Sequence, residues 1–214
     1  MYLFKSLPIL GLCFASPGLT TPGFRTAGPA KGSLNMPEKK EEITWIVQKS
    51  SSLLIAGHTN LSHFSCGVPG YEEPDTLILE GETPGGITLR GSLRIDIGSF
   101  DCRNRLMTGE LRKALKYAQY PLLTIAFINL EQMPLFNDRL QSVRGGVDVG
   151  LAGVCRQFEI DYTSRRIDVT TVELEGCRAF SFSDFRIQPP RKMGGLIRVD
   201  DSLQVRFTLF LKRA

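Results

Sequence analysis

Apolar residues recur at every second position over long stretches of this sequence. The two clearest runs are Ile87, Leu89, Gly91, Leu93, Ile95 and Ile97, and Leu203, Val205, Phe207, Leu209 and Leu211. Alternate side chains of a β-strand point to opposite faces, so this spacing predicts strands with one buried face and one solvated face. Weaker strand patterns cover residues 53–61, 122–131, 147–162, 167–174 and 180–187.

Only one segment has helical spacing. Residues 109–120 place Leu111, Ala114, Leu115 and Ala118 on one helix face and stop at Pro121, with Thr108 as the expected N-cap. About eight one-sided strands and one short helix favour an all-β fold, a closed antiparallel lipocalin-like β-barrel, because closure removes exposed strand edges. A two-sheet sandwich is the alternative.

The N-terminal region is typical of an exported protein. An apolar stretch at residues 7–15 follows Lys5, which predicts a signal peptide over residues 1–18. A lipoprotein leader acylated at Cys13 is less favoured, because Leu12 stands where that signal needs a small residue. Residues 19–42, rich in Gly, Pro, Ser and Thr, are expected to form a flexible tether, and residues 43–214 the barrel domain. The expected location is the periplasm or the medium, and no segment is long enough for a transmembrane span.

Composition and motifs argue against several function classes. The chain has 42% hydrophobic residues, 22% charged residues and a net charge of +4 with no basic run, which indicates a folded protein without a nucleic-acid surface. Neither a nucleophile elbow, a phosphate loop nor a dinucleotide fingerprint occurs, so we expect no enzyme and no cofactor. His58 and His63 are an odd number of positions apart in one expected strand, which predicts opposite faces and no metal site.

Several blocks of residues, taken in order, resemble the YceI family of polyisoprenoid-binding, lipocalin-like proteins. They span residues 45–212 and comprise Trp45, Ile46 and Val47; residues 52–61; Ile95 to Asp101 with Arg103, Asn104, Leu106 and Met107; Tyr120 and Pro121 after the helix; residues 151–154; and residues 182–187. Arg186 departs from the pattern, since glycine is usual at that position in the family.

The resemblance implies a barrel around an apolar channel, an isoprenoid or other lipid ligand, export, and often a homodimer. Four cysteines follow the leader, namely Cys66, Cys102, Cys155 and Cys177, and the residues alone do not fix their pairing. Within the YceI-like order of elements, barrel closure would bring Cys66 and Cys102 together, which makes a disulfide between them a hypothesis.

The candidate ligand site is the set of side chains expected to face the barrel interior. These are Leu53, Ile55, Leu93, Ile95, Ile97, Ile125, Phe127, Phe158, Ile160, Phe180, Phe182, Val205, Phe207 and Leu209. Eight-stranded barrels either enclose a ligand or fill their interior with side chains, so a structural or interaction module of the cell envelope with a packed interior is the alternative function. Arg103, Arg105, Arg112 and Lys113 are candidates to bind a pyrophosphate head group, although a solvated helix face is the more common role of such a cluster.

Overall fold

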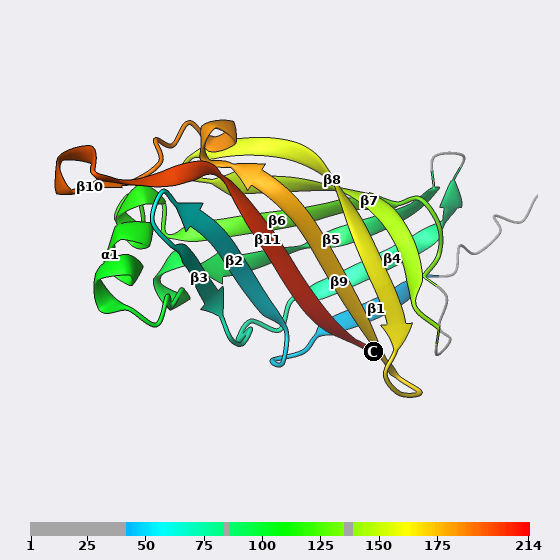
Figure 1. Cartoon of the computed structure of the whole chain (residues 1–214). Helices are drawn as coiled ribbons and strands as arrows, with labels where there is room; N and C mark the ends of the chain where they lie inside the picture. The colour runs from blue at the N-terminus through cyan, green and yellow to red at the C-terminus, as the bar shows by residue number, and fades with distance from the viewer. Residues whose placement is uncertain (1–41, 84–85, 135–138) are drawn as a thin grey trace, which may run out of the picture. The chain divides into compact units, whose positions relative to one another are not determined.

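The computed structural model describes residues 42–83, 86–134 and 139–214 (Figure 1). The expected leader and all but the last residue of the expected tether lie outside these ranges. The strands are β1 (Ile43–Val47), β2 (Ser52–Thr59), β3 (His63–Val68), β4 (Thr76–Thr83), β5 (Gly86–Asp96), β6 (Leu122–Leu130), β7 (Gln141–Leu151), β8 (Val154–Arg166), β9 (Thr171–Ser181), β10 (Arg191–Lys192) and β11 (Ile197–Arg213). Helix α1 spans Arg105–Ala114, and the 3-10 turns are η1 (Ile97–Ser99), η2 (Phe182–Phe185) and η3 (Met193–Gly195).

The strands close into a barrel. Antiparallel pairing runs in the order β1-β4-β5-β6-β7-β8-β9-β11, and β11 returns to β1 through partners such as Val47 and Leu211. The expected closed antiparallel barrel of eight strands with one α-helix is therefore confirmed. Alternate residues along most of the barrel strands point inward and form one apolar core, which is the physical basis of the alternation in the sequence.

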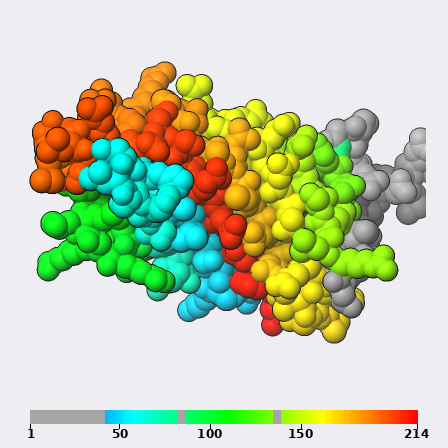
Figure 2. All heavy atoms as spheres, in the orientation of Figure 1, coloured from blue at the N-terminus to red at the C-terminus, as the bar shows by residue number. Residues whose placement is uncertain are grey.

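Strand β11 closes the barrel, because it pairs with both β9 and β1, the two edge strands of the remaining sheet. Its last residues pair with β1, its middle pairs with β2 on one side and β9 on the other, and its start pairs with β10. In Figure 2 its atoms form a diagonal band between those of β2 and β9. Because β2 pairs with a part of β11 that β1 does not reach, the β2–β3 hairpin continues the barrel wall past the end of β1.

The boundaries of three expected strands differ in the structure. The expected strand at residues 147–162 is the end of β7 and the start of β8, joined by a turn in which Ala152 and Gly153 have φ of 52° and 81°. The expected strands at 167–174 and 180–187 are instead one strand, β9, followed by η2. Leu151 and Val154 flank the β7–β8 turn with apolar side chains, so periodicity could not locate that turn.

Helix α1 begins and ends earlier than the residues 109–120 expected from sequence. Its N-cap is Asn104, whose side chain accepts hydrogen bonds from the backbone N–H groups of Leu106 and Met107. Thr108, the expected N-cap, is buried inside the helix, and its hydroxyl accepts from the Cys102 N–H at 3.0 Å. Both side chains can cap a helix, and here Asn104 does so while Thr108 bonds to the segment that precedes the helix.

Candidate ligand-binding cavity

An apolar cavity of about 70 Å³ lies in the barrel at the end covered by α1 and η2. Leu111 and Leu115 reach it from the helix region, while Phe182 and Phe185 reach it from η2. Its lining consists of Leu53, Ile55, Phe100, Leu111, Leu115, Leu123, Ile125, Val147, Val149, Leu151, Ile160, Phe180, Ser181, Phe182, Phe185, Ile187, Leu203, Val205 and Phe207. Because the lining is almost wholly hydrocarbon, a guest held there gains by leaving water and finds few polar partners.

The structure separates the predicted interior residues into three groups. Those that line this cavity are Leu53, Ile55, Ile125, Ile160, Phe180, Phe182, Val205 and Phe207. Leu93, Ile95 and Leu209 instead line an adjoining cavity of about 10 Å³. Ile97, Phe127 and Phe158 line neither of these two cavities. Leu111 and Leu115 were missed as lining residues, although their helical spacing marked them as buried.

The interior is packed rather than hollow in this arrangement of side chains. Ligand pockets usually measure about 300–1,000 Å³, so 70 Å³ is too small for a long chain. Phe207 lies between the two cavities and lines both. Its ring fits because Gly176 faces it: a Cβ at Gly176 would stand 2.2 Å from the Phe207 Cζ. A long guest that occupies both cavities must therefore displace side chains between them, and Phe207 is the largest that lines both.

The deep part of the barrel, away from α1, contains two buried hydroxyl groups. Tyr162 and Ser164 are both fully buried, and neither hydroxyl has a hydrogen-bond partner among the described residues. Burial raises the pKa of the Tyr162 phenol well above its ordinary value. An unsatisfied buried hydroxyl costs stability, so these two groups are expected to lower the free energy of unfolding.

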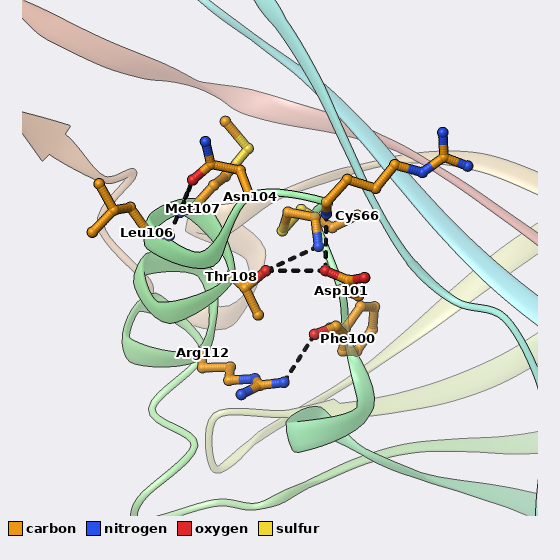
Figure 3. The surroundings of a disulfide bond; sticks show 10 residues. Cys66, Phe100, Asp101, Asn104, Leu106, Met107, Thr108 and Arg112 are labelled. Atoms are coloured by element: carbon orange, nitrogen blue, oxygen red, sulfur yellow. Dashed lines mark hydrogen bonds between the residues drawn. A yellow bond between two sulfur atoms is a disulfide. The ribbon is translucent and has the colours of Figure 1, made fainter.

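The four cations of the predicted head-group cluster differ in their surroundings. The Arg112 guanidinium donates to the backbone carbonyls of Gly98 and Phe100, so it holds the chain before α1 in place (Figure 3). Arg103, Arg105 and Lys113 are exposed. The sequence pattern does not reveal that Arg112, one of the four cations, forms hydrogen bonds within the fold.

One further arginine was missed by sequence reasoning. Strand β8 pairs with β9 only from Asp161 and Cys177 toward the turn, so the two strands diverge at the α1 end. Arg178 occupies the divergence: its guanidinium lies 5.1 Å from the Phe158 ring centre and 5.9 Å from that of Phe180, and it donates to the Glu159 carbonyl. Cation–π contacts and this hydrogen bond therefore connect β8 and β9 where their backbones are not paired.

A disulfide joins Cys66 of β3 to Cys102 before α1, 36 residues apart (Figure 3). Next to it, Gly67 and Asp101 exchange two backbone hydrogen bonds of 2.9 Å. Cys155 and Cys177 are exposed free thiols. The bond and the bridge together fasten β3 to the segment that leads into α1.

The two histidines differ from the sequence expectation. A turn at residues 60–62 separates β2 from β3, so His58 and His63 are directly opposed cross-strand partners with ring centres 4.4 Å apart. The prediction that they lie on opposite faces was wrong, because it treated two strands as one. No group of three or more potential metal ligands occurs among the described residues. Within the same ranges, no helix is long and apolar enough to cross a membrane.

Comparison with solved structures places this barrel among known folds. A polyisoprenoid-binding domain from Saccharophagus degradans, implicated in plant cell wall breakdown, superposes with a TM-score of 0.58 at 16% identity, over 80% of this chain and 98% of that domain. BcnA from Burkholderia cenocepacia gives 0.58 at 13% identity, over 75% and 95% of the two chains. A mutant of the Campylobacter jejuni YceI protein gives 0.51 at 14% identity, over 69% and 85%. The fold is that of the YceI proteins.

No family model matches the sequence, and no curated protein matches it either. The YceI-like barrel is thus recognisable by its architecture at very low identity. Arg186 stands where glycine is usual in the YceI family. It adopts φ 54° and ψ 36° at the end of η2, a left-handed conformation that glycine adopts without strain. The backbone shape is therefore kept despite the change of residue.

Proposed function

We propose that this protein binds an isoprenoid or similar long apolar lipid inside its YceI-like barrel and acts as a carrier, without catalysing a reaction. The observation that carries the proposal is the hydrocarbon-lined cavity beneath α1 and η2. Support also comes from the shared fold with a protein described as a polyisoprenoid-binding domain. Each methylene moved from water into such a lining gains about 0.8 kcal/mol, so a long chain can offset the repacking it requires.

The location and assembly are parts of the same proposal. A signal peptide over residues 1–18 would deliver the barrel to the periplasm or the medium, where the Cys66–Cys102 disulfide is chemically favoured. A lipoprotein anchor at Cys13 is the less favoured variant. A homodimer is also proposed, by resemblance to the family.

A second candidate is an interaction module of the cell envelope with no small ligand. The small volume of the cavity, about 70 Å³, favours it. The two candidates differ in whether the interior opens to admit a chain.

Native mass spectrometry of the full protein, purified without detergent from its producing cells, distinguishes them. We expect a stoichiometric adduct that organic extraction releases as an intact long-chain lipid, and the same spectra report cleavage of the leader and the oligomeric state. A protein that carries no adduct and takes up neither all-trans-retinol nor long-chain prenyl alcohols would support the interaction module. Recovery of a chemically altered lipid would instead indicate catalysis.

A further inference from the structure

The barrel wall is interrupted between β3 and the second half of β5. Strand β4 pairs with β5 only as far as Ile78 and Arg90, and β3 meets the chain after β5 at a single bridge, Gly67 to Asp101. Between these points the described residues 68–73 face residues 94–99 without strand pairing. We call this interval the β3–β5 seam.

The Tyr71 side chain fills the seam. Its hydroxyl accepts the Arg94 backbone N–H at 3.1 Å, a donor on β5 that a neighbouring strand would otherwise satisfy. The same hydroxyl donates to the Asp75 carboxylate, and the Tyr71 backbone N–H donates to the Lys49 carbonyl at 3.0 Å. Tyr71 is only 6% exposed. A single side chain, held by two side-chain hydrogen bonds, therefore stands where a strand pair would be.

Three cavities meet at this point. An external groove of about 790 Å³ runs along the seam and is lined by Lys49, Val68, Pro69, Gly70, Tyr71, Glu72, Glu73, Arg94, Ile95, Asp96, Ser99 and Leu122. It shares Val68, Gly70, Tyr71 and Ile95 with the 10 Å³ cavity. That cavity in turn shares Leu53, Ile125 and Phe207 with the main cavity under α1. Tyr71 therefore lies at the boundary between the outside groove and the small cavity, and Phe207 at the boundary between the small cavity and the main one.

The charges of the groove indicate which head group fits. Glu72, Glu73 and Asp96 contribute three carboxylates, whereas Lys49 and Arg94 contribute two cations. Arg94 is also 3.6 Å from the Asp75 carboxylate, which reduces its attraction for an anion. The groove therefore disfavours a phosphate or carboxylate head and suits a neutral polar head that forms hydrogen bonds.

We propose that the β3–β5 seam is a lateral portal gated by Tyr71, through which the apolar chain of a lipid passes while its neutral polar head stays in the external groove. The proposal rests on the proposed function, since it supplies the route and the head-group class of that ligand. The Cys66–Cys102 disulfide and the Gly67–Asp101 bridge fix one end of the portal, so opening involves residues 68–73.

Binding kinetics of all-trans-retinol, an isoprenoid alcohol, test the portal. Trp45 is the one tryptophan of the chain and is buried in the barrel, so energy transfer from Trp45 to retinol reports entry. Ser99→Phe narrows the groove and should slow association about tenfold, as expected when access becomes limiting. Ser99→Ala controls for the lost bond from Ser99 Oγ to the Asp96 carbonyl, and Gln157→Phe places the same bulk in a different external groove. Both controls should associate like the unaltered protein.

Tyr71→Phe keeps the ring and removes the hydroxyl, so it tests the gate itself. The variant loses the bond from Tyr71 to Asp75, whereas the Arg94 N–H keeps a second acceptor in the Asp75 carboxylate at 3.3 Å. Association and dissociation should therefore both accelerate about three- to tenfold, the factor that one hydrogen bond is worth. A purely structural role would lower the free energy of unfolding without changing these rates. Retinoic acid should bind about fivefold more weakly than retinol, because its carboxylate meets an acidic groove.

The outcomes separate the two proposals. Equal association rates for Ser99→Phe and Gln157→Phe, with retinol still bound, would overturn the portal and leave the carrier function standing. Failure of the unaltered protein to bind retinol or a prenyl alcohol would overturn the carrier function, and the portal with it.

Discussion

The Tyr162 hydroxyl is buried without a partner among the described residues, so we expect it to add nothing to the free energy of unfolding. Tyr162→Phe removes the unsatisfied group and keeps the ring, which lies 5.7 Å from that of Phe207. We expect the free energy of unfolding to stay unchanged or to rise by up to about 1 kcal/mol. Urea denaturation measures it. A loss greater than about 1 kcal/mol would show that the hydroxyl is satisfied in solution.

Phe207 divides the apolar interior, so its removal should merge the two cavities that it lines. Phe207→Ala is expected to lower the free energy of unfolding by about 3–5 kcal/mol. It should also raise the affinity for retinol, because the guest no longer displaces a ring.

Phe210→Ala is the matched control for this variant. Phe210 lies on the same strand, three positions away and on its other face, and is only partly buried. Its substitution should destabilise less and leave retinol affinity unchanged. Equal affinities for the two variants would show that Phe207 does not obstruct the site.

Sequence patterns were most informative for side chains whose environment is set by their own strand. The inward positions of β5 and β11 followed from alternation alone. Tyr71 and Arg178 were not found, since each is defined by a gap in strand pairing that forms only when distant strands meet. The histidine pair shows the converse error, because its geometry depends on a turn that periodicity does not mark.

Among the elements, β3 and α1 depend most on a covalent link. The Cys66–Cys102 disulfide spans 36 residues, and closing such a loop in the unfolded chain is worth about 3–4 kcal/mol. Reduction, or the Cys66→Ser/Cys102→Ser pair, should lower the free energy of unfolding by that amount. Alkylation followed by mass spectrometry should label Cys66 and Cys102 only after reduction.

Cys155→Ser and Cys177→Ser are the controls, because both thiols are free and exposed. They should be labelled without reductant, and their replacement should not alter stability. Labelling of all four cysteines in untreated mature protein would contradict the disulfide.

The limits of the elements were harder to predict than their existence. The sequence located a helix, yet its start at Arg105 depends on the Asn104 cap and on the fastened segment before it. The turn between β7 and β8 is formed by Ala152 and Gly153 within a run that reads as continuous strand. Such limits are set by local backbone conformations, which leave little trace in an apolar pattern.

Considered as a whole, the molecule should lose stability at alkaline pH through two tyrosines. The pKa of Tyr71 is raised by burial and by its hydrogen bond to Asp75, and that of Tyr162 by burial. A phenol whose pKa is higher in the folded state than in the unfolded state stabilises the fold. This stabilisation is complete below the unfolded pKa, near 10, and declines as the pH rises above it.

We therefore expect the free energy of unfolding to be nearly constant from about pH 7 to 9 and to fall above about pH 10. The measurement is urea denaturation across this range. In Tyr71→Phe/Tyr162→Phe the decline should be shallower, and an unchanged slope would assign the alkaline loss to other groups.

Strand β11 has a consequence for the order in which the barrel is assembled. It is the partner of β1, β2 and β9, so a chain emerging from the ribosome holds an open sheet with two bare edges until β11 has been made. Closure joins the beginning of the domain to its end, and contacts so distant along the chain form slowly. The domain therefore remains an open sheet until β11 has been synthesised, and during that time its unpaired edges can pair with other chains.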